Sequence, residues 1–96
     1  MSPKNKKKLL IIRKKLDLID NKLLNLLKIR ANQVKRVLSL KEHKNEIIDK
    51  KRISQILKNI KNKSIKNKID PKITNQIWKK MIYAYIDYER RNFKKK

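Results

Sequence analysis

The sequence has no cysteine, no glycine, two prolines and one histidine among its 96 residues. Without cysteine there is no disulfide framework, no thiolate chemistry and no thiolate metal site. Without glycine there is no glycine-rich phosphate loop. The one histidine, His43, excludes a metal site built from several histidines, and its polar surroundings predict a solvated loop residue. No apolar run is long enough for a membrane span or a signal peptide, so we expect a cytoplasmic protein.

The charge is strongly one-sided, with 30 Lys and Arg against 8 Asp and Glu and a net charge of +22. Such an excess can indicate nucleic-acid binding. However, the chain also holds 15 Ile and 10 Asn, and Lys, Ile and Asn all have A/T-rich codons. The lysines are spread along every segment, whereas nucleic-acid binders more often group them with stacking aromatic residues. A basic helical nucleic-acid-binding protein is therefore kept only as the non-enzyme alternative.

Apolar residues recur at helical spacing and predict an all-α fold of one long and two shorter helices. The first helix is expected from about Lys6 to Lys41, followed by a loop over residues 43–48. Asp49 can cap a second helix, and Asp70-Pro71 is a strong start signal for a third that ends near Phe93. We expect a single domain over residues 6–93, with a disordered tail at 1–5 and a basic tail at 94–96.

Polar residues fall on the apolar stripes of all three helices. Arg30 and Lys41 continue the stripe of the first helix, which comprises Ile12, Leu16, Ile19, Leu23, Leu26, Leu27, Val34 and Val37. Asp49 and Arg52 are in phase with the predicted inner face of the second helix, at Ile53, Ile56, Leu57 and Ile60. Glu89 extends the predicted inner face of the third, at Ile77, Trp78, Met81, Ile82 and Tyr85.

Charges on inner faces need compensation, because an unpaired buried charge costs several kcal/mol. The three cations outnumber the two acids, which predicts a cationic cavity for a small anion with two or more carboxylates. This set of inner-face residues contains no Ser, Cys or His, and paired carboxylates at helical spacing are absent from it. Nucleophilic catalysis and glycoside hydrolysis are therefore unsupported, and an enzyme of this composition has to work by positioning and electrostatics.

The length of the first helix predicts a partner chain. About 33 residues span roughly 50 Å, whereas a compact domain of this size is only about 32 Å across. Two shorter helices cannot cover the whole apolar stripe. A second copy of the chain is the simplest cover, so we expect an obligate homodimer.

The sequence resembles the all-helical chorismate mutase family over residues 9 to 91. The second helix contributes Asp49-x-x-Arg52, and Asp70-Pro71 opens the third as in many members. The first helix carries the most specific pattern, Ile12-Arg13-x-x-Leu16-x-x-Ile19-Asp20-x-x-Leu23-Leu24-x-Leu26-Leu27-x-x-Arg30, followed by Val34, Val37 and Lys41.

The resemblance implies an intertwined homodimer of three-helix chains that rearranges chorismate to prephenate without a metal or a cofactor. It implies that Arg30 and Arg52 hold the substrate, with Arg13 reaching in from the partner subunit. Lys41 would bind the ether oxygen and a carboxylate, and Glu89 would act on the other side of that oxygen. The substrate-binding residues implied by the resemblance are Arg13, Arg30, Lys41, Asp49, Arg52 and Tyr85.

Two positions depart from the common family pattern. Ile53 follows Arg52 where the family commonly has Glu, and Tyr85 stands where many members have Ser. Both changes resemble the branch that includes isochorismate–pyruvate lyase, as does the interval from Lys41 to Arg52. Chorismate mutase is therefore the leading interpretation, and isochorismate–pyruvate lyase is the alternative enzyme.

Overall fold

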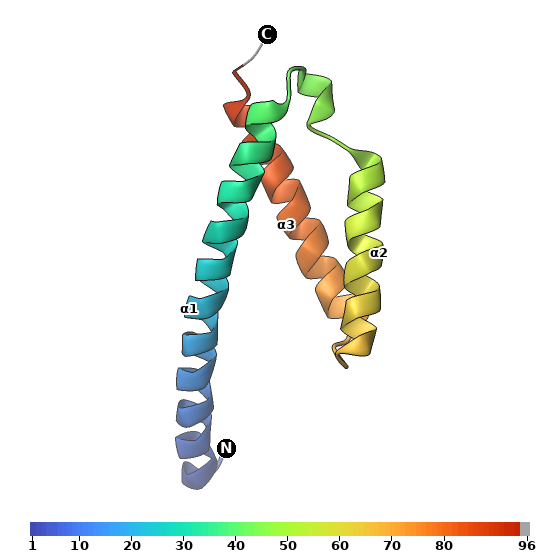
Figure 1. Cartoon of the computed structure of the whole chain (residues 1–96). Helices are drawn as coiled ribbons and strands as arrows, with labels where there is room; N and C mark the ends of the chain where they lie inside the picture. The colour runs from blue at the N-terminus through green and yellow to red at the C-terminus, as the bar shows by residue number, and fades with distance from the viewer. Residues whose placement is uncertain (95–96) are drawn as a thin grey trace. The chain divides into compact units, whose positions relative to one another are not determined.

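The computed structural model describes residues 1–94, and within this range the secondary structure is entirely helical. Helix α1 spans Pro3–Leu40, α2 spans Lys50–Lys66 and α3 spans Pro71–Asn92. A single 3₁₀ turn, η1 (Lys44–Glu46), lies between α1 and α2 (Figure 1). The prediction of one long and two shorter helices is confirmed. Of the predicted basic tail, Lys94 lies beyond α3, and residues 95 and 96 lie outside the described residues.

Helix α1 begins earlier than predicted. Pro3–Asn5, expected in a disordered tail, are helical because Ser2 caps the helix: its hydroxyl accepts a hydrogen bond from the Asn5 N–H at 3.2 Å. Proline at the first helical position is also favourable, since its missing N–H would have no partner there. At the other end the helix stops at Leu40, one residue before the predicted Lys41.

The chain divides into two compact units, Met1–Gln33 and the part from Val34 onward. In the described chain, no residue of α1 is buried. Its predicted inner stripe is open, with Ile12, Leu16, Ile19 and Leu23 each at least half exposed. Among the described residues these four side chains therefore form an exposed apolar stripe on α1.

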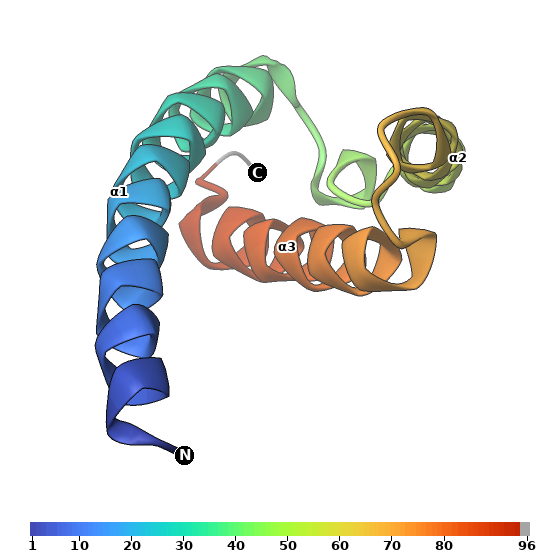
Figure 2. The ribbon, with the colours of Figure 1, turned by 90° about the horizontal axis from the view of Figure 1, so that it is seen from below.

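Within the second unit, α2 and α3 pack together and run in opposite directions from the turn that joins them (Figure 1). Figure 2 looks almost along the axis of α2 and shows the start of α3 beside it. Both helices start where the sequence predicts. The Asp49 side chain accepts from the Arg52 N–H at 3.0 Å, and the Asp70 side chain accepts from the Lys72 N–H at 2.9 Å. Each carboxylate thereby satisfies a backbone donor that has no partner in its helix.

The turn between α2 and α3 is a Schellman motif built without glycine. The Ile69 N–H donates to the Ser64 carbonyl at 2.9 Å, and the Lys68 N–H donates to the Ile65 carbonyl at 3.1 Å. Lys68 takes the left-handed conformation, with φ 59°, where glycine is the usual residue. Beside this turn, the hydroxyls of Ser64 and Thr74 lie 2.7 Å apart and are buried, which joins the end of α2 to the start of α3.

The core lies at the opposite end of this helix pair. It consists of Ile47 from the loop and Ile82 and Ile86 from α3, with partly buried apolar side chains around them from α1, α2 and the C-terminal segment: Leu38, Ile53, Ile56, Leu57 and Phe93. The prediction of Ile77 as an inner residue is wrong, because its side chain is 53% exposed. Ile86 takes part in its place, one turn above Ile82 on the same face of α3.

Candidate functional site

Lys41 and Glu89 form a largely buried ion pair. The Lys41 Nζ lies 3.5 Å from the Glu89 Oε1, and the side chains are 16% and 7% exposed. Glu89 projects from the last turns of α3, and Lys41 is the first residue after α1. The sequence places Lys41 and Glu89 on the inner faces of different helices. The structure brings them together, so that each charge compensates the other.

Lys41 also contacts the loop that it opens. Its Nζ donates to the Ile47 carbonyl at 3.4 Å, so that the ammonium group lies between α3 and the loop backbone. Ile47 is the most buried apolar residue, at 4% exposure, which fixes the loop to the core. Lysine has three donors, and these two contacts leave capacity for an oxygen of a ligand.

Asp49 and Arg52 are less enclosed than predicted. Both are exposed in the chain, because the start of α2 lies at the rim of the core. Asp49 caps the first turn of α2 by accepting from the Arg52 N–H. The Arg52 guanidinium is held in the same turn, because its Nη1 donates to the Gln55 Oε1 at 3.2 Å. The guanidinium thus points along α2, with its other N–H groups available for a carboxylate.

The two departures from the family pattern have structural consequences in the same unit. Ile53 packs against the core cluster, so the position after Arg52 supplies apolar contact in place of a carboxylate. Tyr85 is partly buried on α3, one turn before Glu89 and on the same side of the helix. The site region is accordingly more apolar than the common pattern would make it.

Arg13 and Arg30 belong to the first unit, on α1. Arg13 is exposed and Arg30 is partly buried. Their assignment to the site is a prediction from the resemblance, taken up under the proposed function below.

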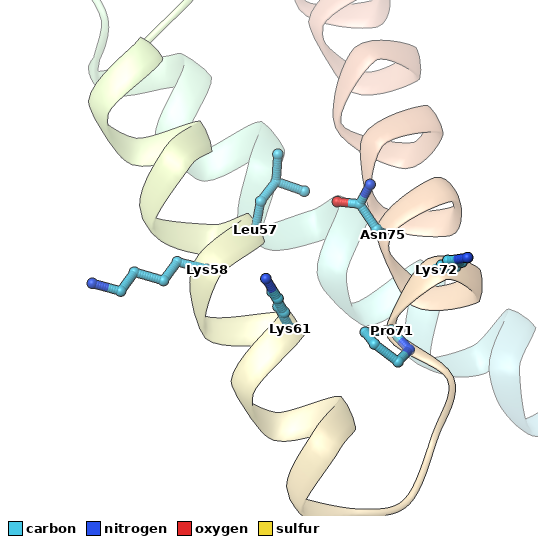
Figure 3. Close-up of a pocket in the computed structure, with 6 residues that line it drawn as sticks. All are labelled: Leu57, Lys58, Lys61, Pro71, Lys72 and Asn75. Carbon is cyan, nitrogen blue, oxygen red and sulfur yellow. The ribbon is translucent and has the colours of Figure 1, made fainter.

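A shallow depression of about 650 Å³ lies where the loop meets α2, lined by Lys41, Glu46, Ile48, Asp49 and Lys50. Two of the predicted site residues, Lys41 and Asp49, therefore share one hollow. A second groove lies between α2 and α3 near their connecting turn. Figure 3 shows Leu57 and Asn75 facing this groove from the two helices, with Pro71 at the start of α3. None of the predicted site residues lines the second groove.

The described residues contain no group of three or more His, Asp or Glu side chains that could hold a metal ion. Helices that are long and apolar enough to cross a membrane are likewise absent from the described part of the chain. His43 is exposed in the loop, as predicted.

Sequence reasoning missed Glu46 and Ile47, which organise the loop between Lys41 and Asp49. The loop has no helical periodicity, so a pattern search finds no inner face in it. One signal was present: Glu46 stands three residues after His43, the spacing at which a glutamate can accept from a backbone N–H at the start of a helical turn. The structure contains that contact, at 2.9 Å.

The family model for chorismate mutase type II matches residues 12–90. This span covers most of the chain and includes every predicted site residue from Arg13 to Glu89. The chain belongs to this family. The comparisons with curated proteins and with solved structures gave no match.

Proposed function

We propose that the chain is a monofunctional chorismate mutase that converts chorismate to prephenate on the route to phenylalanine and tyrosine. The reaction is a unimolecular rearrangement in which one C–O bond breaks as one C–C bond forms. It requires no covalent intermediate and no cofactor. The protein has to hold the substrate in a reactive conformer and stabilise negative charge on the ether oxygen.

Lys41 and Glu89 are the residues proposed to act on that oxygen. The Lys41 ammonium group is already desolvated and held by the Ile47 carbonyl, so little reorganisation is needed when charge develops near it. Glu89 can add a second hydrogen bond only when protonated, because an ionised carboxylate has no proton to donate. Substrate binding therefore replaces the Lys41–Glu89 ion pair with contacts from both groups to the ligand.

The remaining roles follow from the family. Arg30 and Arg52 bind the carboxylates, Arg13 reaches the site from the partner subunit, and Asp49 contacts the region of the ring hydroxyl. Tyr85 is the remaining contact. Forked guanidinium groups suit this task because each can bind a carboxylate through two parallel N–H donors.

The observation that carries the proposal is the match of the family to residues 12–90, together with the cation of Lys41 in the hollow beside Asp49. Product analysis tests it. Purified protein is incubated separately with chorismate and with isochorismate, and the products are separated by chromatography. Prephenate from chorismate at a rate well above the uncatalysed reaction is the expected result. No rate enhancement with chorismate would refute the proposal.

The second candidate is an isochorismate–pyruvate lyase, favoured by Ile53 and Tyr85. Ile53 is committed to the core and offers no carboxylate for a ring hydroxyl. The same incubation separates the two activities, since the lyase releases pyruvate and salicylate from isochorismate. Replacing Ile53 with Glu sharpens the distinction: it should favour chorismate over isochorismate if this position selects the substrate.

We also propose that the active form is a homodimer. Helix α1 is about 57 Å long at 1.5 Å per residue, and within the described chain none of its residues is buried. Its exposed apolar stripe is far larger than the scattered apolar residues expected on a monomer. A second copy would cover the stripe and would bring its Arg13 to the site.

Mixed dimers test this arrangement. Arg13→Ala and Arg30→Ala should each abolish most activity on their own. When the two variants are refolded together, half of the dimers carry one intact site of two, so about a quarter of the wild-type sites should return. An absence of any recovery in the mixture would show that both arginines serve the same subunit, or that the chain acts alone. Sedimentation of the wild type distinguishes these explanations.

A further inference from the structure

The loop between Lys41 and Asp49 is closed around one carboxylate. The Glu46 Oε1 accepts from two successive backbone donors, the His43 N–H at 2.9 Å and the Glu42 N–H at 3.3 Å. The backbone completes the turn, because the Glu46 N–H donates to the His43 carbonyl at 3.0 Å. Glu46 therefore holds the turn through both its side chain and its backbone N–H.

This turn determines where the next residue lies. Ile47 follows Glu46 directly and packs against Ile82 and Ile86 in the core. Its carbonyl oxygen is the acceptor for the Lys41 Nζ. If the turn opens, only the packing of the Ile47 side chain is left to position its carbonyl, and the contact of Lys41 with that carbonyl weakens.

Glu46 also lies beside the site without being suited to bind the substrate. It lines the same hollow as Lys41 and Asp49. The Glu46 carboxylate would repel a dianionic substrate in direct contact with it. Its hydrogen-bond partners are instead the backbone N–H groups of Glu42 and His43. Its location and its partners agree with a supporting role.

We propose that Glu46 is a positioning residue, which closes the turn over residues 42–46 and thereby holds Lys41 in its reactive place through the Ile47 carbonyl. The role rests on the proposed mutase function of Lys41. It requires the hydrogen-bond acceptor of Glu46 and not its charge, because the two partners are neutral N–H groups.

Steady-state kinetics with chorismate gives the first test. Glu46→Ala should lower kcat about tenfold and change KM by less than about threefold, since the displaced Lys41 acts mainly in the transition state. Glu46→Gln keeps an oxygen acceptor and should recover most of that loss. Glu42→Ala is the matched control: it removes the same charge from the same loop, and the Glu42 carboxylate makes no hydrogen bond or ion pair with the described residues.

A double-mutant cycle separates positioning from a general effect on the fold. In the Lys41→Ala background, Glu46→Ala should cause no further loss, because the residue through which it acts is gone. A full additional tenfold loss in that background would overturn the proposal. So would a wild-type kcat for Glu46→Ala, or a Glu46→Gln variant as slow as Glu46→Ala.

Amide hydrogen exchange tests the turn independently of catalysis. In the wild type the amides of Glu42 and His43 should be protected, and in Glu46→Ala they should exchange about tenfold faster or more, while the amides of α3 are unchanged. Unchanged exchange at both amides would refute the loop role. If the wild type fails to convert chorismate, the proposed function is wrong, and the exchange result still decides whether Glu46 closes the turn.

Discussion

The two ends of the α2–α3 pair each bury a polar contact, and the contacts differ in kind. At the turn, the Ser64 and Thr74 hydroxyls lie 2.7 Å apart, and each also contacts a backbone carbonyl of its own helix. At the other end, the charged groups of Lys41 and Glu89 lie 3.5 Å apart beside an open hollow.

Under the proposed function, the Ser64–Thr74 end is structural and the Lys41–Glu89 end binds the ligand. Neutral hydroxyls are inexpensive to bury once they are hydrogen-bonded, and the Ser64–Thr74 pair leaves neither group with much capacity for a ligand. A buried ion pair contributes little net stability, because desolvation offsets most of the attraction. Its retention at the hollow therefore points to a use in ligand binding.

The largest effect should come from removing the cation. Lys41→Ala should lower kcat on the order of 100-fold or more, as expected for loss of a key transition-state donor. It should also destabilise the fold by about 2 kcal/mol, because the Glu89 carboxylate loses its buried partner. Kinetics and thermal unfolding measure the two effects.

The double variant Lys41→Ala, Glu89→Gln separates them. Neutralising residue 89 should restore most of the lost stability and none of the lost activity. Recovery of activity together with stability would show that Lys41 supports the fold only. The proposed functional role of the Lys41–Glu89 end would then be refuted.

A smaller effect should appear at Glu89. An ionised carboxylate has no proton to donate, whereas an amide always donates, so Glu89→Gln should keep or raise kcat/KM if residue 89 gives a hydrogen bond to the ether oxygen. Glu89→Ala removes the group and should lower kcat/KM. Steady-state rates of the three proteins provide the measurement. Equal kcat/KM for the wild type and Glu89→Ala would remove Glu89 from the chemistry.

At the neutral end, changes should affect stability alone. Ser64→Ala and Thr74→Val should each cost about 1–2 kcal/mol, because each leaves the other hydroxyl with one partner fewer in a buried place. The double variant should cost less than the sum of the two. Chemical denaturation measures the free energies, and kcat should stay at the wild-type value. A fall in kcat beyond about threefold would contradict the structural assignment.

The smallest effect concerns the turn beside this pair. Lys68 is held at φ 59°, which is unfavourable for a residue with a side chain. Lys68→Gly should relieve this cost and raise the free energy of unfolding by up to about 1 kcal/mol, despite the greater freedom of glycine in the unfolded chain. A decrease in the unfolding midpoint would show that the Lys68 side chain stabilises the fold by more than its left-handed backbone conformation destabilises it.

Helix starts were predictable because their signals are local. Asp49 and Asp70-Pro71 cap their helices as the sequence indicates. The burial of Glu89 was also predictable, since it continues a helical stripe through Ile82. The start of α1 at Pro3 was missed because the lysine-rich segment that follows has no apolar pattern, although Ser2 and Pro3 are both favourable there.

Features that depend on contacts across elements were not predictable. The pairing of Lys41 with Glu89 joins residues 48 positions apart, and no local pattern specifies it. The hydroxyl pair of Ser64 and Thr74 joins two helices, and no apolar pattern marks either residue. Asp49 and Arg52 are in phase with an apolar face and are nevertheless exposed, because the face extends beyond the end of the core.

The most direct measurement compares the two ends in one assay of chorismate conversion. The wild type, Lys41→Ala and the double variant Ser64→Ala, Thr74→Val are assayed in parallel, at a temperature where all three are folded. We expect prephenate from the wild type and the hydroxyl variant with similar kcat, and a loss on the order of 100-fold or more for Lys41→Ala. Equal rates for Lys41→Ala and the wild type, or no prephenate from any of the three, would contradict the account.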